Sequence, residues 1–422
     1  MKKTEQKYQA FVQILKEELI PAMGCTEPIS LAYGASIARK VLNHLPTKIV
    51  VEASGSIIKN VKSVIVPHTH HLKGIKAAVC AGIIGGNDDK YLEVLSQIDE
   101  KTKKEIDQYI EKVDFEEHFL DSSKVFDYII TVWNKKEYVK VRISDSHMHV
   151  VCIEKNGQIL QEEKSVKKEK ADRSLLDIKD IYDFIKTVEL TDIQDILERQ
   201  IDYNYAIACA GLNDNYGANI GKVLLKSFGN DVKNKAKAYA AAGSDARMNG
   251  CELPVVINSG SGNQGMTCSL PVIIYAQELK VSKEKMLRAL ALSNLVAIHE
   301  KSGIGTLSAY CGAVSAATGA GAGIAYLYDE DYQAVIHTIV NTLANVSGIV
   351  CDGAKASCAA KIASSVDAAI LGYHMYKNGQ EFKSGDGLVM ENVEATIQSV
   401  GRLGREGMRE TNKEIIKMMI HE

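Results

Sequence analysis

The feature that constrains the fold most is a change in the hydrophobic pattern along the chain. Between about residues 46 and 172, short runs rich in β-branched and aromatic residues, such as KIVVEA, SVIVP, FDYIITVW and EYVKVRIS, predict strands. The segments 74–86 and 96–113 between these runs predict helices. From residue 173 to residue 422 helical patterns dominate, and loops of Gly and Ser interrupt them. A strand-rich segment followed by a large helical segment predicts an α+β fold.

The N-terminal 45 residues predict two helices. The segment AFVQILKEELI, residues 10–20, places its apolar residues on one helical face, and Pro21 ends the pattern. A second helix is expected from Pro28 to about residue 43, so Cys25 lies in the loop before it. We expect residues 1–45 to pack on a helical domain, 173–422, beside a smaller α/β domain, 46–172. The charged segment 155–174 predicts a solvated hairpin or linker.

The net charge and the cysteine content limit the kinds of partner and the cellular compartment that fit this chain. The net charge of -3 gives no general attraction to nucleic acid or to anionic lipid. The chain shows no apolar export segment near its start and no run that resembles a membrane helix. Its nine cysteines are an odd number, which favours reduced thiols over a disulfide framework. We therefore expect a cytoplasmic protein with a small substrate, and the small-residue helix 312–327 allows a homo-oligomer.

Cysteines recur in segments of small residues, namely at Cys25, Cys268, Cys311, Cys351 and Cys358. A lone cysteine is usually a small buried hydrophobe, and we expect a structural role for Cys80, Cys152, Cys209, Cys251 and Cys268. The three thiols of Cys311, Cys351 and Cys358 could instead hold three corners of a cubane iron-sulfur cluster. Their spacing includes no C-x-x-C pair, so spacing alone favours core thiols over ligands.

The loop NSGSGNQG, residues 258–265, combines glycines with Ser259, Ser261, Asn263 and Gln264. A helix is expected to begin after it, and exposed amides at a helix N-terminus beside hydroxyls and carboxamides suit a carboxylate. A plain flexible loop is the alternative interpretation. The run GAGAG, residues 319–323, follows no strand, so it predicts close helix packing and not a nucleotide site.

Histidines cluster in VPHTHHLKG and in DSHMHV. If the second segment is a strand, His147 and His149 face the same side and could share a metal ion or a substrate. No third ligand is fixed nearby in the sequence, so we favour a solvated or hydrogen-bonded histidine cluster over a metal site.

Several long motifs together resemble one family: PAMGCTEPISLAYGAS, GSGNQGMTCSLPV, AYCGAVSAATGAGAGIAYL, SGIVCDGAKASCAAKIASSVDAA, KSGDGLV and GREGM. In this order, over nearly the whole chain, the sequence resembles the L-cysteine desulfidase family, also described as serine dehydratase alpha-like. The resemblance implies a [4Fe-4S] enzyme that converts L-cysteine to sulfide, ammonia and pyruvate without pyridoxal phosphate. An iron-sulfur L-serine dehydratase, or a related lyase of small amino acids, is the alternative.

The resemblance also implies roles for individual residues. Cys311, Cys351 and Cys358 match the cluster ligands, and Cys25 matches the cysteine of the GCTEP motif. A thiol beside a helix N-terminus and a cationic metal centre predicts a lowered pKa, so Cys25 is the candidate base, or else the fourth cluster ligand. The substrate carboxylate is assigned to the loop, and a further substrate contact to His147, which gives the set Ser259, Ser261, Asn263, Gln264 and His147.

One departure from the family pattern and one alternative class of function bear on this assignment. His68 and His70 lie where the family is richer in glycine, which bears on the identity of the substrate. A non-catalytic iron-sulfur or redox-sensing protein could use the same cysteines. A sensor usually carries a recognition domain, and the sequence shows none.

Overall fold

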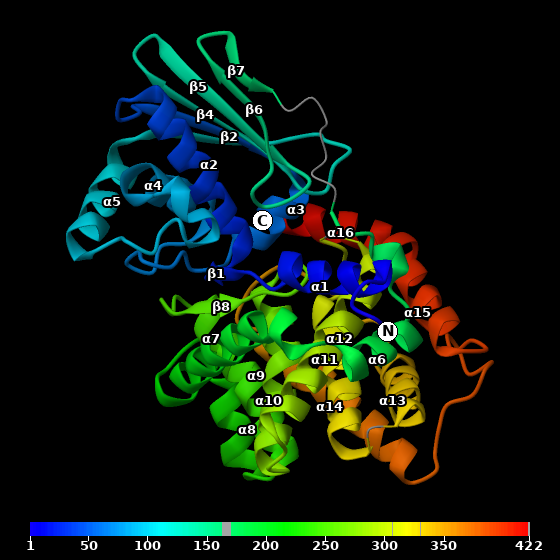
Figure 1. The fold of residues 1–422 in the computed structure, drawn as a ribbon. Helices are drawn as coiled ribbons and strands as arrows, with labels where there is room; N and C mark the ends of the chain where they lie inside the picture. The colour runs from blue at the N-terminus through cyan, green and yellow to red at the C-terminus, as the bar shows by residue number, and fades with distance from the viewer. Residues whose placement is uncertain (163–169, 306, 330, 421–422) are drawn as a thin grey trace.

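The computed structural model describes residues 1–162, 170–305, 307–329 and 331–420. A six-stranded sheet with its helices forms one region and a larger bundle of helices forms the other, so the α+β prediction is confirmed (Figure 1). The charged segment 155–174 begins with the β6–β7 hairpin, as expected, and its residues 163–169 lie outside the described residues. No helix in the described parts of the chain has both the length and the hydropathy needed to cross a membrane.

The sheet has the strand order β3-β2-β4-β5-β6-β7. Its strands are β2 (Lys48–Ala53), β3 (Asp114–Phe119), β4 (Asp127–Asn134), β5 (Glu137–Ser144), β6 (Val150–Lys155) and β7 (Gln158–Glu162). Only the β2–β3 pair is parallel among these strands. Alternate residues of β2, namely Ile49, Val51 and Ala53, are buried, which is the pattern of a sheet that packs its core on one face.

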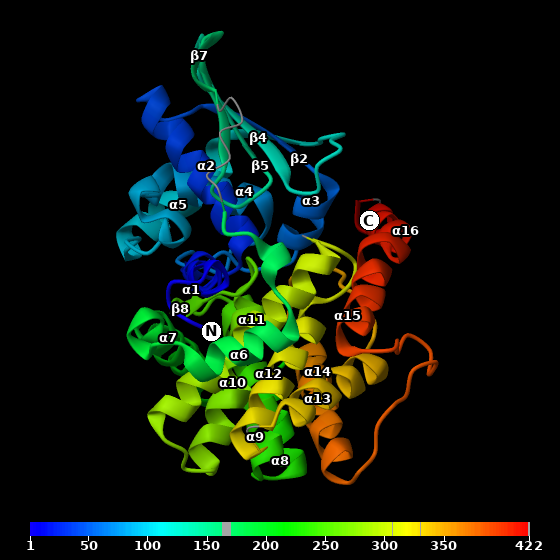
Figure 2. The same cartoon turned by 45° about the vertical axis from the view of Figure 1, so that its right-hand side comes forward.

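Helices cover one face of this sheet (Figures 1 and 2). They are α2 (Thr26–Leu42), α4 (Gly74–Gly85) and α5 (Glu100–Lys112), and the short α3 (Gly55–Val61) follows β2. Helix α2 packs closely against α4 because Gly82 has no side chain: a Cβ there would lie 2.2 Å from the carbonyl oxygen of Ala32.

The helical region begins with α6 (Ile178–Thr187) and ends with α16 (Arg409–Ile420). Between them lie α7 (Gln194–Asn213), α8 (Ile220–Phe228), α9 (Val232–Met248), α10 (Gly262–Glu278), α11 (Lys283–Ile304), α12 (Gly312–Asp329), α13 (Tyr332–Asn345), α14 (Cys358–Lys377) and α15 (Val393–Arg402). Helix α12 is packed against α10, α11, α13 and α14. A Cβ at Gly319 would lie 2.3 Å from the carbonyl oxygen of Ser293, so GAGAG serves close helix packing, as predicted.

The two regions are joined by segments that are distant in sequence. Strand β1 (Pro21–Met23) pairs antiparallel with β8 (Pro254–Val256), and α16 returns from the C-terminal end to pack on α3. Helix α1 (Gln6–Glu18) contacts α11 and α6 in the helical region. Helix α2, by contrast, packs on α4 and β5. The expectation that both N-terminal helices pack on the helical domain is therefore corrected for α2, whose buried residues face the sheet.

Candidate active site

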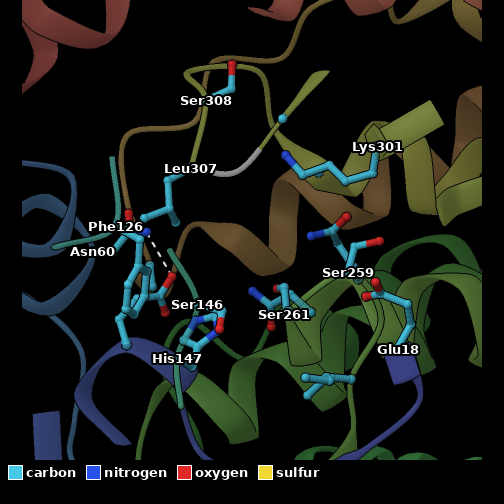
Figure 3. A pocket seen from close by; sticks show the side chains of 18 of the residues that line it. Glu18, Asn60, Phe126, Ser146, His147, Ser259, Ser261, Lys301, Leu307 and Ser308 are labelled. Carbon is cyan, nitrogen blue, oxygen red and sulfur yellow. Dashed lines mark hydrogen bonds between the residues drawn. The ribbon is translucent and has the colours of Figure 1, made fainter. Parts of the chain in front are cut away.

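A cavity of about 1000 Å³ lies between the two regions (Figure 3). The α/β region contributes Cys25 and Glu27 from the start of α2, Asn60 from α3, and His147 from the loop between β5 and β6. The helical region contributes further polar lining, namely Lys301, Ser259, Ser261, Asn263, Gln264, Arg247, Cys311, Cys351 and Cys358. Every residue that the sequence assigned to the site lines this cavity.

Paired loops bring two of the cysteines together. The amide of Cys311 donates to the carbonyl of Ile349 at 2.9 Å, and the amide of Cys351 donates to the carbonyl of Ala309 at 2.6 Å. These reciprocal bonds flank a bridge between Tyr310 and Val350, so the 307–312 and 349–353 loops run antiparallel. A hydrogen bond between the two thiols raises the pKa of Cys311 and lowers that of Cys351. Of the two thiols, that of Cys351 therefore ionises more readily.

The third cysteine, Cys358, is the first residue of α14. Burial raises the pKa of its thiol, and the charge of Cys351 raises it further. No three His, Cys, Asp or Glu side chains in the described ranges are grouped closely enough for a single metal ion. All three cysteines line the cavity, and the pKa of Cys311 responds to both Cys351 and Cys358, so the three thiols lie in one part of it.

Two lysines face these cysteines. Lys59, on α3, is 2% exposed, and its Nζ donates to Asn412 Oδ1 at 2.7 Å and to the carbonyl of Cys351 at 3.4 Å. Burial lowers the pKa of Lys59 and of Lys301, and the charges of Cys351 and Cys311 act against that shift. The positive charge of both lysines in turn favours the Cys351 thiolate. Cysteine thiols with two lysines beside them fit a metal centre whose thiolate ligands carry negative charge.

Cys25 and Glu27 form a hydrogen-bonded pair at the start of α2. The Cys25 thiol donates to Glu27 Oε2 at 3.1 Å, and Asn60 Nδ2 donates to Glu27 Oε1 at 2.9 Å. Burial opposes ionisation of Glu27, but the charge of His147 and the hydrogen bond from Cys25 outweigh it and hold its pKa below the ordinary value. Glu27 is therefore a carboxylate that accepts two hydrogen bonds.

The pKa of Cys25 differs from the sequence-based expectation. Burial raises it well above its ordinary value, and the negative charge of Glu27 raises it further. The expected lowering from the N-terminus of the helix is outweighed because a carboxylate lies within hydrogen-bond distance of the sulfur. Cys25 is a thiol whose proton has an acceptor beside it.

His147 lies in a loop and not on a strand, because β6 begins only at Val150. Its ring packs on Phe126 at 4.8 Å between centroids, and its carbonyl accepts from Ser30 Oγ at 2.6 Å. Its Nε2 is shielded from solvent without a partner among the described residues, and burial lowers the pKa of the ring. His149 does not line the cavity, and its Nδ1 lies 2.8 Å from the carbonyl oxygen of Ser144. Only His147 lines the cavity, so the structure gives no support to a site shared with His149, which was the less favoured alternative from the sequence.

The loop before α10 meets the α/β region at the cavity. Ser261 occupies the N-cap position of α10, and the backbone at Ser259 and Gly260 has φ of 49° and 77°. The carbonyl of Gly260 accepts from Thr26 Oγ1 at 2.9 Å. In Figure 3, Asn60 and His147 approach from one side and Ser259, Ser261 and Lys301 from the other. The loop thus lies within reach of anything held near Cys25 and Glu27.

Several lining residues escaped the sequence analysis: Glu27, Lys59, Asn60, Arg247 and Lys301. Glu27 stood within the GCTEP motif, two residues after Cys25, so a signal existed for it. Arg247 stands alone in GSDARMNG and carries no motif. Conversely, His68 and His70 do not line the cavity; His70 pairs with Asp107 at 2.5 Å, and His68 lies 3.6 Å from Glu252. Their departure from the family pattern lies outside the site.

A comparison with known protein families identifies the family of this chain. Residues 89–417 match the family described as serine dehydratase alpha chain. The chain belongs to the serine dehydratase alpha chain family. The match includes His147, Arg247, the SGSGNQG loop and the three clustered cysteines, and it begins after Cys25, Glu27 and Asn60. This family assignment is broader than the resemblance to L-cysteine desulfidases.

Relatives match over nearly the full length, including the N-terminal part. A UPF0597 protein of Desulfitobacterium hafniense is 56% identical over 425 residues, which covers 100% of this chain and 99% of that protein. UPF0597 proteins of Lachnoclostridium phytofermentans and Treponema denticola are 50% and 44% identical, covering 98% of this chain and 100% and 98% of their own lengths. These names state no activity, so the reaction of this member of the serine dehydratase alpha chain family must be argued from its site.

Proposed function

We propose that the protein is a [4Fe-4S]-dependent lyase that eliminates sulfide from L-cysteine and yields pyruvate and ammonia. The observation that carries the proposal is the joint lining of one cavity by three clustered cysteines and the Cys25–Glu27 pair. The first set suits a cluster with one iron left free of protein ligands, and the second suits proton transfer. Both are needed for an elimination of this kind.

Cys311, Cys351 and Cys358 would hold the cluster, with the positive charges of Lys59 and Lys301 beside it. When bound, such a cluster supplies a Lewis-acidic iron that accepts the sulfur of the substrate and makes it a better leaving group. Substrate thiol is a soft ligand, which suits iron in a sulfur environment. This preference favours L-cysteine as the substrate.

Cys25 and Glu27 account for the proton. As the Cys25 thiol passes its proton to the Glu27 carboxylate, its sulfur takes the proton from the α-carbon of the substrate. The raised pKa of Cys25 makes its thiolate a stronger base for this carbon acid. The electron pair of the broken C–H bond forms the Cα–Cβ double bond, and the pair of the C–S bond leaves with sulfide. The aminoacrylate released becomes an imine, which water hydrolyses to pyruvate and ammonia.

L-serine is the second candidate substrate, and membership of the serine dehydratase alpha chain family favours it. A serine hydroxyl must be protonated as it leaves, so its elimination needs an acid in the cavity. Tyr310 lines the cavity, and burial raises the pKa of its phenol, so this group carries its proton at neutral pH. The two substrates must therefore be compared side by side.

The test is anaerobic purification, or reconstitution with iron and sulfide, followed by an assay on both amino acids. We expect iron and acid-labile sulfide in the protein, with release of sulfide and pyruvate in equal amounts from L-cysteine. Pyruvate from L-serine alone would reassign the protein as a dehydratase. A colourless, iron-free protein after reconstitution would overturn the cluster and with it the proposed function.

A further inference from the structure

Arg247, near the C-terminal end of α9, is a buried cation whose hydrogen bonds are incomplete. It is 2% exposed and lines the cavity. Its Nη1 donates to Asn263 Oδ1 at 3.1 Å, while Nε and Nη2 have no partner among the described residues. Buried donors without acceptors are costly, and more so when they carry charge. The two free donors therefore point to an acceptor that comes from outside the chain.

A second arginine of the same molecule shows what this edge of the guanidinium binds. Arg142, on β5, donates from Nε to Asp127 Oδ1 at 3.0 Å and from Nη2 to Asp127 Oδ2 at 2.6 Å. These are the same two nitrogens that are free in Arg247. Nε and Nη2 form a planar fork that matches the two oxygens of a carboxylate. Arg247 thus presents a carboxylate-binding edge without a carboxylate of its own.

The surroundings of Arg247 preserve this edge. A Cβ at Gly262 would lie 2.3 Å from Arg247 Nε, so the first residue of α10 must be glycine for the guanidinium to lie there. Glu27 is close enough for Arg247 to lower its pKa, after larger effects from His147 and the Cys25 hydrogen bond. The hydrogen bonds to Glu27 nevertheless come from Cys25 and Asn60, because the single hydroxyl proton of Thr26 goes to the carbonyl of Gly260. Glu27 therefore leaves the fork of Arg247 free.

We propose that Arg247 binds the α-carboxylate of the substrate through Nε and Nη2, and that this contact restricts the enzyme to small amino acids with a free carboxylate. This inference rests on the proposed function for the identity of the substrate. It moves the main carboxylate contact from the SGSGNQG loop to α9, with Asn263 of the loop holding the guanidinium from the other side. The carboxylate then lies in the cavity that Cys25 and Glu27 also line.

The test uses binding of L-alanine, which has the carboxylate and the ammonium group but no leaving group. Calorimetry with the iron-loaded protein compares L-alanine with L-alaninamide, which lacks the carboxylate. We expect the native protein to prefer L-alanine by about 10²-fold, and Arg247→Gln to lose that preference because L-alanine alone binds more weakly. Arg247→Lys, which keeps the charge but not the fork, should retain part of the preference.

Two further variants keep the test decisive. Arg142→Lys is the matched control, since Arg142 lies outside the cavity lining, and its preference for L-alanine should equal that of the native protein. Gly262→Ala displaces the guanidinium without removing it and should lower the preference at least tenfold, so it serves if Arg247→Gln does not fold. Equal loss of both ligands, or an unchanged preference in folded Arg247→Gln, would overturn the proposal. Because L-alanine does not react, a protein that binds it through Arg247 but leaves L-cysteine intact would refute only the proposed function.

Discussion

The two regions of the molecule supply opposite kinds of group to one cavity. The helical region provides the three clustered thiols, Lys301, Arg247 and the SGSGNQG loop, which are suited to bind a cluster and an anion. The α/β region provides mainly proton-handling groups: the Cys25–Glu27 pair, Asn60 and the ring of His147. Lys59 is the exception, because it reaches from α3 to the Cys351 loop. In the proposed reaction, binding and proton transfer are therefore divided between the two regions, and variants in one region should leave the role of the other intact.

The largest effect is expected from Cys351→Ala in the helical region. Removal of this thiol takes away a proposed cluster ligand and the partner of Cys311, so iron and activity should be lost together. Iron content and sulfide release from L-cysteine measure both losses. Cys209→Ala is the matched control, because Cys209 is half-buried and lies outside the cavity lining. A Cys351→Ala protein that keeps a full cluster would show that the ligand set is wrong.

Glu27→Gln should produce the next largest effect, and in the α/β region it should spare the iron. The amide still fills the space but cannot take the Cys25 proton, so kcat/KM for L-cysteine should fall by about 10²- to 10⁴-fold. Iron content and the visible spectrum should match those of the native protein. Loss of iron in Glu27→Gln would break the division between the regions, because it would make the α/β region part of the cluster site.

Buried aspartates in the two regions predict opposite effects of pH on stability. Burial raises the pKa of Asp245, in the helical region, to about 6, against backbone hydrogen bonds that lower it. The protonated form is therefore favoured in the folded state, and the free energy of unfolding should fall by about 2 kcal/mol as pH rises from 4 to 6. For Asp127, in the α/β region, burial is outweighed by hydrogen bonds from Arg142 and Ser122, and its pKa lies below the ordinary value. Its contribution is present above about pH 4 and is lost in acid.

Urea unfolding between pH 3 and 8 checks both signs. Asp245→Asn should flatten the decrease between pH 4 and 6, while Asp127→Asn should flatten the loss of stability in acid and leave the first interval unchanged. A native protein whose stability does not change between pH 4 and 6 would contradict the assignment for Asp245.

The sequence predicted those parts of the molecule that depend on local pattern. Strands β2, β4 and β5 and the helix that contains Pro28 follow from short-range periodicity, although this helix begins at Thr26, two residues before the expected start. Strand β3 was missed because DFEEHF is largely polar and lies at an edge of the sheet, where few residues are buried. The run SVIVP was wrongly expected to be a strand, since only an isolated bridge from Ile65 to Lys73 forms there.

The residues of the candidate site also fall into those that a local sequence pattern revealed and those that it did not. Its cysteines and loop stood in unusual motifs of small residues, which made them visible in the sequence. Arg247, Lys59 and Lys301 became visible only when helices far apart in the chain came together: Lys59 lies 292 residues from its partner Cys351. The spacing of residues within one helix or strand carries no information about such contacts. A single buried lysine or arginine also forms no repeating pattern that could be recognised in the sequence.

The smallest effect is expected at the junction where α16 returns to the α/β region. Gly55, the first residue of α3, would place a Cβ 2.6 Å from Ile416 Cγ2 on α16 if it were alanine, so Gly55→Ala forces the helices apart. Overpacking of this kind costs about 1–3 kcal/mol. Lys59 bonds to Asn412 of the same helix, and the displacement should therefore also disturb the lysine beside Cys351. Gly348→Ala, where the added Cβ meets no atom within 4 Å, is the control. The midpoint temperature of thermal unfolding and kcat/KM should both fall in Gly55→Ala and stay unchanged in Gly348→Ala. A loss of stability with full activity would show that α16 supports the fold without positioning the site.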